Sequence, residues 1–279
     1  MRSDLAGVIL DWTGAVLRFV FGHLFTALKG WPPILSLALI SLVSGVAMLW
    51  VFGRISNQEA IGRAKRRLVA SLYELRLFAD EPALVWRAQK ELVAANLRYL
   101  ALVFQPAIVL TVPMIVLLFQ LESFYGLLPL PVNVPAIVSV QMKGDVSGVR
   151  PQLLAPDGVT VETPPLRVPW EHRIYWRIRP KRELEGALRI QWTDGAIEKA
   201  VACGTTHRYL ARRRVSSLFD QFLYPAEKRL HRGPVGWVEI RYPTTEISCL
   251  GIRSHWLVWF LLISIGSAWL LRKRFRVVM

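Results

Sequence analysis

The chain has 279 residues, of which 53% are hydrophobic and 20% are charged. A soluble globular domain usually carries fewer hydrophobic residues beside that share of charge, so the excess is expected to lie in a membrane. The formal net charge of +15 would indicate nucleic-acid binding in a soluble chain. In a membrane protein it is typical of cytoplasmic loops and of contacts with anionic lipid headgroups. We therefore expect a bilayer with anionic headgroups as a partner, and no direct DNA binding.

The first 30 residues are predicted to form an amphipathic helix that lies in the membrane interface. The segment 4–28 is apolar, yet Asp4, Asp11 and Arg18 recur every seven residues and therefore share one helical face. A helix with this pattern is stable at the surface of a bilayer. The alternative is a fourth membrane span whose polar stripe faces protein.

Three later segments, 34–53, 103–121 and 254–271, are predicted to cross the membrane as helices. The first contains no charge, and its length is sufficient at 1.5 Å per residue to cross a hydrocarbon core of about 30 Å. The second is also uncharged, and its two prolines predict a kink. The third is shorter and is followed by a basic cytoplasmic tail, 272–279, that is typical of a stop-transfer signal.

The distribution of lysine and arginine predicts the orientation. The loop 54–102 holds nine Lys and Arg against five Asp and Glu, and the tail adds four cations, so both are expected in the cytoplasm. An odd number of spans then places the N-terminus and the segment 122–253 on the other side, because long domains are translocated largely regardless of charge. The chain is predicted to be an integral protein of a bacterial inner membrane, with its C-terminus in the cytoplasm.

The cytoplasmic segment 54–102 is predicted to be a helical hairpin. In its first helix, apolar residues recur at intervals of three and four: Ile61, Ala64, Leu68, Leu72, Leu75 and Ala79. Asp80 is the expected N-cap of the second helix, with Pro82 in its first turn. The second helix is expected to pack against the first through Val85, Trp86, Leu92, Val93, Leu97 and Leu100.

The plainer interpretation of the hairpin is that it only joins two spans and that its charged face is solvated. Two helices of about twenty residues project roughly 30 Å, however, which is more than a connection requires. We therefore expect the hairpin to contact a client or a ribosome. The candidate contacts are its basic residues, Arg63, Lys65, Arg66, Arg67, Arg76, Arg87 and Lys90.

The segment 127–250 is predicted to be an extracytoplasmic β-sandwich of immunoglobulin-like kind. Its alternating stretches predict six strands, at 137–142, 159–163, 172–179, 187–192, 197–203 and 237–242. Asp157-Gly158 and Asp194-Gly195 are typical of tight hairpin turns. Short strands with turns at this spacing favour the immunoglobulin-like arrangement.

The stretch 206–232 interrupts this strand pattern. In one interpretation its apolar residues, 218–224, sink into the membrane interface while the neighbouring cations contact lipid phosphates. The candidate lipid contacts are Arg212, Arg213, Arg214, Lys228 and Arg229. In the other interpretation the stretch is a plain helical insertion packed on the sandwich.

Two cysteines, Cys203 and Cys249, fall in the outer segment, where a disulfide would persist. Two free thiols are the equally compatible alternative. The sequence has no GxSxG, HExxH or P-loop motif, and its histidines lack the spacing of a metal site. We therefore expect neither an enzyme nor a bound cofactor or metal.

The order of these elements resembles the core of the YidC/Oxa/Alb insertase superfamily, in particular its small three-span members of the archaeal YidC-like type. The resemblance rests on QEAIGRAKRRL and RAQKELVAANLRYL in the hairpin, and on Gln105-Pro106 and VPM at 112–114 in the next span. It covers residues 5–125 and 254–276. The β-domain is a departure, because it lies where the small members have a short connection.

This resemblance implies a hydrophilic groove, open to cytoplasm and lipid, that eases short segments across the membrane. The candidate groove residues in this chain are Arg54, Ser41, Ser44, Gln105 and Thr111. The plainer interpretation is that Ser and Thr within spans satisfy backbone groups or pack helices. In the family the hairpin contacts the ribosome or a substrate carrier.

The sequence thus predicts a membrane protein biogenesis factor, insertase- or chaperone-like, that receives hydrophobic clients through the basic hairpin. The alternative is a non-catalytic scaffolding subunit of a larger membrane complex, which docks a partner membrane protein through its outer β-domain. A channel formed by oligomerisation of the same spans is a third hypothesis.

Overall fold

The computed structural model describes residues 2–28, 30–77, 82–146, 148, 150–192, 195–230, 233–249 and 251–275. The chain divides into two compact units. The β-unit consists of residues 1–36 and 116–256, and the helical unit consists of residues 37–115 and 257–279.

The helical unit is built from most of α2 (Pro33–Ile55) and α4 (Pro82–Leu121), from α3 (Gln58–Leu77) and from α6 (Trp256–Leu271). Within the described part of the chain, two helical stretches are long and apolar enough to cross a membrane: α2 and Gln89–Gly126. The third predicted span, α6, has 16 residues, or about 24 Å at 1.5 Å per residue. It is therefore shorter than a hydrocarbon core of about 30 Å.

The second helix of the hairpin and the predicted span 103–121 are continuous. One helix of 40 residues, α4, runs through both segments and contains Pro106 and Pro113. No glycine and no cluster of turn residues separates the two segments, and the residues around position 102 are good helix formers. The charged end of the hairpin and the apolar stretch therefore belong to a single rod of about 60 Å.

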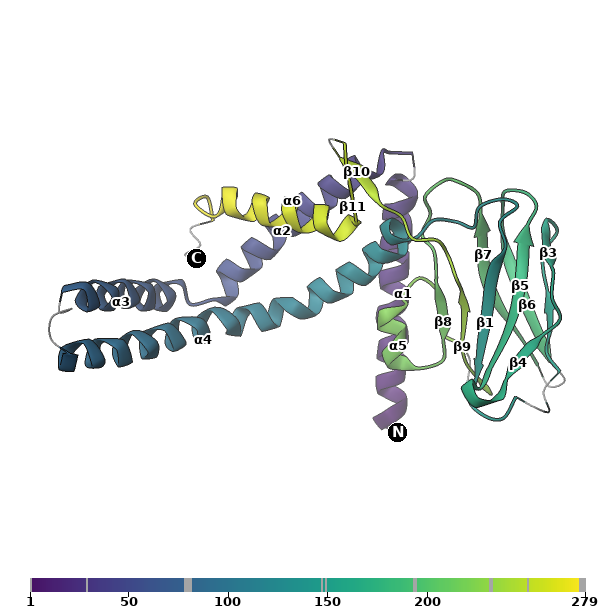
Figure 1. Ribbon diagram of the computed structural model, residues 1–279, viewed down its shortest axis with the longest axis horizontal. Coiled ribbons are helices and arrows are strands. Elements are labelled where there is room, and N and C mark those ends of the chain that lie inside the picture. The colour runs from purple at the N-terminus through teal and green to yellow at the C-terminus, as the bar shows by residue number, and fades with distance from the viewer. Residues whose placement is uncertain are drawn as a thin grey trace. The chain divides into compact units, whose positions relative to one another are not determined.

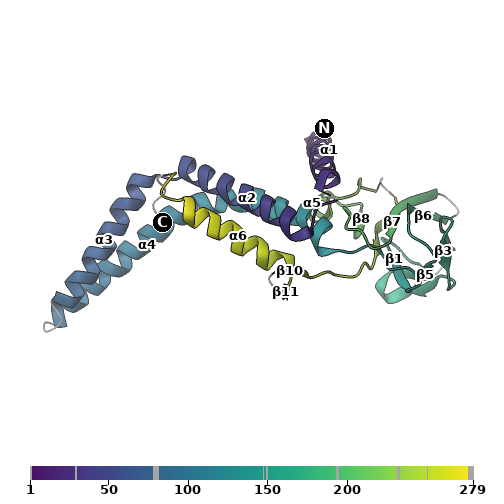
Figure 2. The ribbon, with the colours of Figure 1, turned by 90° about the horizontal axis from the view of Figure 1, so that it is seen from above.

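The helical hairpin itself is present: α3 and α4 run side by side in both ribbon views (Figures 1 and 2). Asn57 caps α3, because its Oδ1 accepts a hydrogen bond of 3.0 Å from the backbone N–H of Ala60. The predicted cap of the second helix, Asp80, lies outside the described residues.

Small residues bring α2 and α6 close together. A Cβ atom built on Gly45 of α2 would lie 2.5 Å from the carbonyl oxygen of Ser264 and would also overlap the hydroxyl of Ser267. Ser41, one turn before Gly45, is fully buried. Close approach through small side chains is typical of packing between membrane helices.

The described part of the β-unit contains a two-stranded sheet, β10-β11, and two larger antiparallel sheets, which are drawn mainly in teal to green in Figure 1. The larger has the order β3-β5-β1-β9-β8, with β4 also paired to β5, and the smaller has the order β2-β6-β7. One hydrophobic core takes side chains from both sheets, among them Val138 and Trp176 from the larger and Leu188 and Val201 from the smaller. The separate β-domain is thus confirmed, while its immunoglobulin-like character stays a prediction.

All six predicted strands are present with small shifts at their ends. They are β1 (Ala136–Met142), β3 (Val159–Val161), β5 (Arg173–Pro180), β6 (Leu184–Trp192), β7 (Gly195–Cys203) and β9 (Val235–Ile240). Five strands of three residues were not predicted, because so short a stretch shows no alternation: β2 (Gln152–Leu154), β4 (Leu166–Val168), β8 (Arg213–Val215), β10 (Ile247–Cys249) and β11 (Ile252–Ser254). A 3-10 turn, η2 (Pro169–Glu171), leads into β5.

One of the two predicted hairpins is wrong. The strands β6 and β7 pair with Trp192 opposite Gly195, as a tight hairpin requires, although Asp194 lies outside the described residues. Gly158, by contrast, has a φ of +101° in a turn that joins β2 to β3, and these strands belong to different sheets. The Asp-Gly pair predicts a sharp turn correctly, but it does not specify which strands pair.

Helical segments close one side of the β-unit. The helix α1 (Arg2–Leu28) buries Phe25, whose ring stacks on Phe124 at 4.4 Å between centroids. Phe124 belongs to the π-helix η1 (Glu122–Gly126), where Glu122 accepts a hydrogen bond of 2.7 Å from Trp256 Nε1. The short helix α5 (Leu218–Leu223) packs against α1. Within residues 206–230, α5 thus packs against α1, and residues 213–215 form the strand β8.

Candidate functional site

A continuous row of exposed apolar side chains runs along one face of α4, and we call it the α4 stripe. Its spacing of three, four or seven residues keeps every member on the same side of the helix. Each member exposes 40–65% of its surface. The α4 stripe consists of Trp86, Val93, Leu97, Leu100, Phe104, Ile108 and Ile115.

Between Ala95 and Pro106, the opposite face of α4 is the packed one. Ala95 exposes only 6% of its surface and Pro106 is buried, whereas Tyr99 and Leu102 between them are half-buried. The buried positions of α3 are Ile61, Ala64 and Ser71, with Leu68 half-buried and Leu72 exposed. Part of the predicted stripe of α3 is thus confirmed.

Four of the six residues in the predicted packing face of the second helix are exposed. We expected Trp86, Val93, Leu97 and Leu100 to face α3, and these four residues lie on the exposed side instead. The helix carries apolar residues on two faces, and the face with the small Ala95 is the buried one. Periodicity identifies an apolar face but does not show which neighbour covers it.

Exposed cations occur on both helices of the hairpin. The predicted basic residues whose side chains are described, Arg63, Lys65, Arg66, Arg67, Arg87 and Lys90, are all exposed, and the side chain of Arg76 lies outside the described set. The ammonium group of Lys90 lies 5.3 Å from the ring centroid of Trp86. This cation–π contact stabilises Trp86 at the surface. The ion pairs Glu59–Arg63 and Arg87–Glu91 are exposed and contribute little.

The five candidate groove residues differ in burial and in hydrogen bonding. Ser41 is buried, and its hydroxyl donates to the carbonyl oxygen of Leu37 at 2.7 Å. Thr111 is exposed and likewise donates to the carbonyl oxygen of Ala107 at 2.9 Å. These bonds satisfy the backbone of the same helix, as the plainer interpretation expects.

The other three candidates differ in their surroundings. Ser44 is half-buried and Gln105 is exposed. Arg54 is exposed at the end of α2, where its guanidinium lies 5.2 Å from the ring centroid of Trp50. Arg54 is thus engaged with its own helix.

Three of the five candidate lipid contacts are held by other groups of the β-unit. Arg212 and Arg213 both pair with the carboxylate of Glu239, at 2.9 Å each. Arg214 donates to the carbonyl oxygens of Lys228 and Glu198. Lys228 is exposed and Arg229 is half-buried, and together with Arg214 they line a basic pocket beside α1.

Both cysteines are free thiols in the structure. Cys203 is completely buried in the core between the two sheets, and burial raises its pKa to about 11. Cys249 in β10 is half-buried. Of the two alternatives, the structure has the free thiols and not the disulfide.

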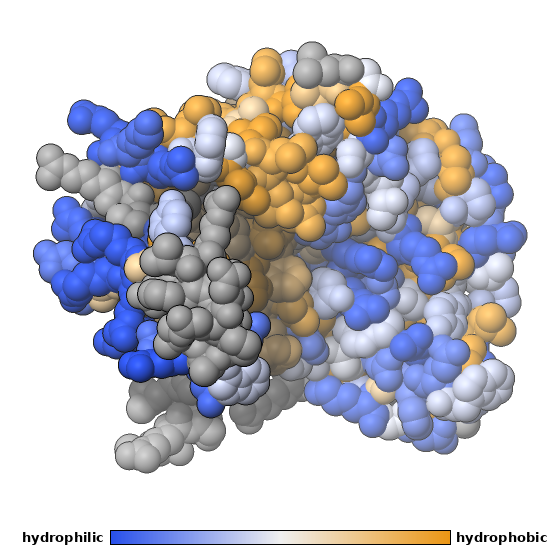
Figure 3. All heavy atoms as spheres, turned by 60° about the vertical axis from the view of Figure 1, so that its left-hand side comes forward, coloured by the Kyte–Doolittle hydropathy of each residue, from blue (hydrophilic) through white to orange (hydrophobic). Residues whose placement is uncertain are grey.

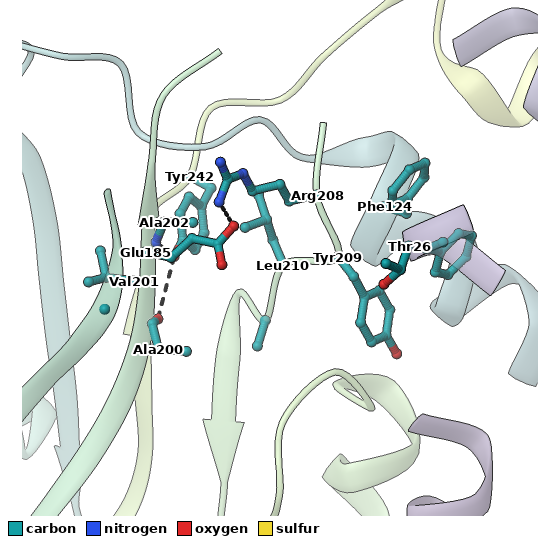
Figure 4. Close-up of a pocket in the computed structure, with 13 residues that line it drawn as sticks. Thr26, Phe124, Glu185, Ala200, Val201, Ala202, Arg208, Tyr209, Leu210 and Tyr242 are labelled. Carbon is teal, nitrogen blue, oxygen red and sulfur yellow. Dashed lines mark hydrogen bonds and ion pairs between the residues drawn. The ribbon is translucent and has the colours of Figure 1, made fainter. Parts of the chain in front are cut away.

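A second pocket, of about 460 Å³, lies between α1 and the edge strand β7 (Figure 4). One side is aromatic, with Phe124 and Tyr209 near Thr26, and the other carries the ion pair of Glu185 with Arg208. Tyr242 lies behind this ion pair, and burial raises its pKa. The pocket therefore has an apolar and a charged half.

Comparisons of the chain with protein-family models, with curated proteins and with solved structures gave no match. Sequence reasoning missed the exposure and the continuity of the α4 stripe. The signal was present in the spacing of Val93, Leu97, Leu100, Phe104 and Ile108, but the assumed boundary at residue 102 divided it.

Proposed function

We propose that the protein is a membrane protein biogenesis factor, insertase- or chaperone-like, that receives hydrophobic segments on the α4 stripe. The observation that supports this proposal is the continuity of the α4 stripe. The stripe stays on one face of a single helix from Trp86 in the basic hairpin to Ile115 in the apolar stretch. That distance is about 43 Å at 1.5 Å per residue.

In this proposal α2, the apolar part of α4 and α6 cross a bacterial inner membrane. Only 6% of the most apolar 18 residues of the stretch Gln89–Gly126 is buried, whereas the core helix of a soluble domain would be covered. Hydrophobic side chains also gather in a contiguous patch on the face shown in Figure 3. A patch of this kind marks a membrane or partner contact. The hairpin is cytoplasmic and the β-unit lies outside, as the lysine and arginine bias indicates.

The stripe gives a physical route for a client. A hydrophobic segment that leaves water between Trp86 and Leu100 would bury apolar surface worth about 25 cal/mol per Å². Because Phe104, Ile108 and Ile115 continue the same face, the segment would move toward the bilayer without exposure to water. The surrounding cations would suit anionic lipid headgroups or the RNA of a ribosome.

The alternative function is a scaffolding subunit of a larger membrane complex. Anchors at positions i, i+4, i+7 and i+11, such as Val93, Leu97, Leu100 and Phe104, also suit a permanent partner helix. A permanent partner would cover the α4 stripe at a fixed stoichiometry. A client would cover it only transiently.

Site-specific photocrosslinking tests the proposal. A photoreactive amino acid replaces Val93 or Leu97 on the stripe, and Asn96, which is exposed on another face of the same turn, serves as the control position. Membranes are then incubated with ribosome-bound chains that carry one hydrophobic segment. We expect crosslinks to this segment from positions 93 and 97 and few from position 96.

Other outcomes separate the hypotheses. Equal crosslinking from all three positions would show that the stripe has no special affinity for the segment. A product of one constant mass, formed without ribosomes, would favour the scaffold. As a matched pair of variants, Leu97→Asp should reduce client crosslinking from position 93 at least fivefold, whereas Asn96→Asp, which adds the same charge, should leave it within twofold.

A further inference from the structure

Part of the α4 stripe repeats every seven residues. Trp86, Val93 and Leu100 form one row with this period. Leu97 and Phe104 form a second row, which alternates with the first in steps of four and three residues. Such a pattern defines the a and d positions of a coiled coil, whose partner is another long helix. We call these positions the α4 seam, which consists of Trp86, Lys90, Val93, Leu97, Leu100 and Phe104.

The helix α3 leaves the α4 seam uncovered. The five apolar members of the seam each expose between 40% and 62% of their surfaces. Ala95, which exposes only 6%, lies at the position of the seven-residue repeat that is farthest from the seam. The packed side of the helix is thus turned away from the seam. A further helix can therefore pack on the seam without displacing α3.

The residues beside the seam carry no charge between Val93 and Phe104. In a coiled coil the positions that flank the seam select the partner through the sign of their charges. These positions hold Ala94, Asn96, Ala101 and Val103. Two identical helices of a chain with a net charge of +15 can therefore meet along this stretch without like-charge repulsion.

One cation lies within the seam. Lys90 occupies the seam position between Trp86 and Val93, and its ammonium group is 5.3 Å from the ring centroid of Trp86. A single lysine at such a position specifies the alignment of a coiled coil at a cost in stability. A pair of helices that meet along the seam should therefore have one alignment and separate readily.

The α4 stripe is large enough for two copies of the chain to pair. Its seven side chains expose 40–65% of their surfaces, which is roughly 100 Å² for each side chain. Two stripes in contact would cover about 1,400 Å² in total, and stable interfaces between proteins cover about 1,200–2,000 Å². The exposed area thus matches what a dimer requires.

We infer that, in the absence of a client, the α4 stripes of two copies cover each other as a parallel pair of helices. Two chains that enter one membrane in the same orientation have parallel α4 helices, and a two-fold axis then places each seam residue against the same residue of the other copy. A client separates the pair, so that self-pairing regulates access to the client site. This inference rests on the proposed function, because it requires the same orientation and the same client-binding face.

Oxidative crosslinking of the full chain in native membranes tests whether seam residues of equal number meet. Cysteine replaces Leu97 or Leu100 in a Cys249→Ser background that keeps the buried Cys203. Arg98→Cys is the control, because Arg98 is exposed on another face of the same turn. Only cysteines whose Cα atoms lie within about 7 Å form a disulfide, so positions 97 and 100 should give about fivefold more crosslinked dimer than position 98.

The mass of the product identifies the partner. A product of twice the chain mass is a second copy, whereas a different permanent partner would add a different mass. Equal dimer yields from positions 97, 98 and 100, or no dimer from positions 97 and 100, would overturn the inference.

Opposite charges at one seam position give a second test that needs no oxidant. Leu97→Asp and Leu97→Lys should each lower the dimer fraction in mild detergent, as measured by native mass spectrometry, because like charges then meet across the seam. A mixture of the two variants should restore a mixed dimer about fivefold above either variant alone. Arg98→Asp, outside the seam, should leave the dimer fraction within about twofold. A mixture with no more dimer than the separate variants would overturn the inference.

The response to a client separates this inference from the proposed function. Ribosome-bound chains with one hydrophobic segment should lower the dimer crosslink from position 97 at least threefold, and chains with a polar segment should leave it unchanged. Client crosslinks from position 93 without any dimer crosslink from position 97 would overturn the inference and leave the proposed function standing. A dimer crosslink that no client lowers would show a permanent dimer and would overturn both.

Discussion

The ammonium group of Lys199 and the carboxylate of Glu227 form an ion pair of 2.5 Å inside the β-unit. Lys199 has no exposed surface, and its Nζ also donates to the carbonyl oxygen of Ala211 at 2.5 Å. Burial lowers the pKa of Lys199, and the charge of Glu227 opposes that shift. The pair joins β7 to the segments that precede β8 and β9, and thereby supports the basic pocket.

Breaking this pair from its two ends should have unequal effects. Glu227→Ala leaves an ammonium group buried without a counter-charge and should destabilise the protein by about 3 kcal/mol or more. Lys199→Met removes the buried charge at similar volume, and the carboxylate of Glu227 is still 15% exposed, so we expect a smaller loss. Thermal unfolding of the full chain in detergent, followed by near-ultraviolet circular dichroism, measures both. Equal losses of stability in the two variants would argue against a buried ammonium group without a counter-charge as the cause of the destabilisation.

The contact between α2 and α6 should not tolerate a methyl group at Gly45. The added Cβ would lie 2.5 Å from the Ser264 carbonyl oxygen, which belongs to the backbone and cannot rotate away. Gly45→Ala should therefore cost about 1–3 kcal/mol through overpacking. Gly266→Ala is the matched control, because nothing lies within 4 Å of a Cβ there. Unfolding in the same detergent compares the stabilities of the two variants. An unchanged stability of Gly45→Ala would refute the close contact between the helices.

The two thiols should react at very different rates. Cys203 is fully buried, and its pKa of about 11 keeps it protonated at neutral pH. Cys249 is half-buried and should react with a maleimide at least tenfold faster in the folded chain. Mass spectrometry of peptides from timed reactions measures both rates. Comparable reaction rates would contradict the unequal burial of the two thiols. Resistance of both cysteines until a reductant is added would contradict their description as free thiols.

Acid should remove the stabilisation that comes from Glu162. A hydrogen bond from Arg179 and the charges of Arg179 and Arg177 hold the pKa of this carboxyl below its ordinary value of 4.5. Because the folded pKa is the lower one, the stabilisation is complete above pH 4.5 and is lost as the pH falls through the folded pKa. The unfolding temperatures of the unaltered chain and of Glu162→Gln should thus differ at pH 7 and converge only once the pH falls below the folded pKa of Glu162. A constant difference would exclude the ionised carboxylate as the source.

Labelling from one side of the membrane tests the proposed orientation. Lys65 in α3 and Thr160 in β3 are both exposed, so each can be replaced by cysteine in a Cys249→Ser background. An impermeant maleimide added to intact cells should label position 160 and not position 65. In inverted membrane vesicles the pattern should reverse. Labelling of position 65 in intact cells would place the hairpin outside and remove the basis of the proposed client route.

Much of the local structure could be predicted from the sequence. Alternation predicted the five strands of six to nine residues and also β3, and the uncharged run at 34–53 predicted α2 to within two residues at each end. These signals are local, because side-chain spacing follows from the backbone geometry of a single element. The strands β2, β4 and β8 were missed because three residues cannot show a period, and they exist only because β6, β5 and β9 offer partners.

The candidate sites required the tertiary structure. The spacing of Val93, Leu97, Leu100 and Phe104 is visible in the sequence, but their exposure follows from Ala95 lying on the buried face of α4. Arg18 and Lys228 lie 210 positions apart in the sequence and line one pocket only because α1 lies beside the larger sheet. The local sequence pattern determines which faces of an element are apolar or charged, since the character of a face depends only on residues that are neighbours in the sequence. Contacts between elements decide which faces are covered and which distant charges converge, because burial is a property of the whole fold.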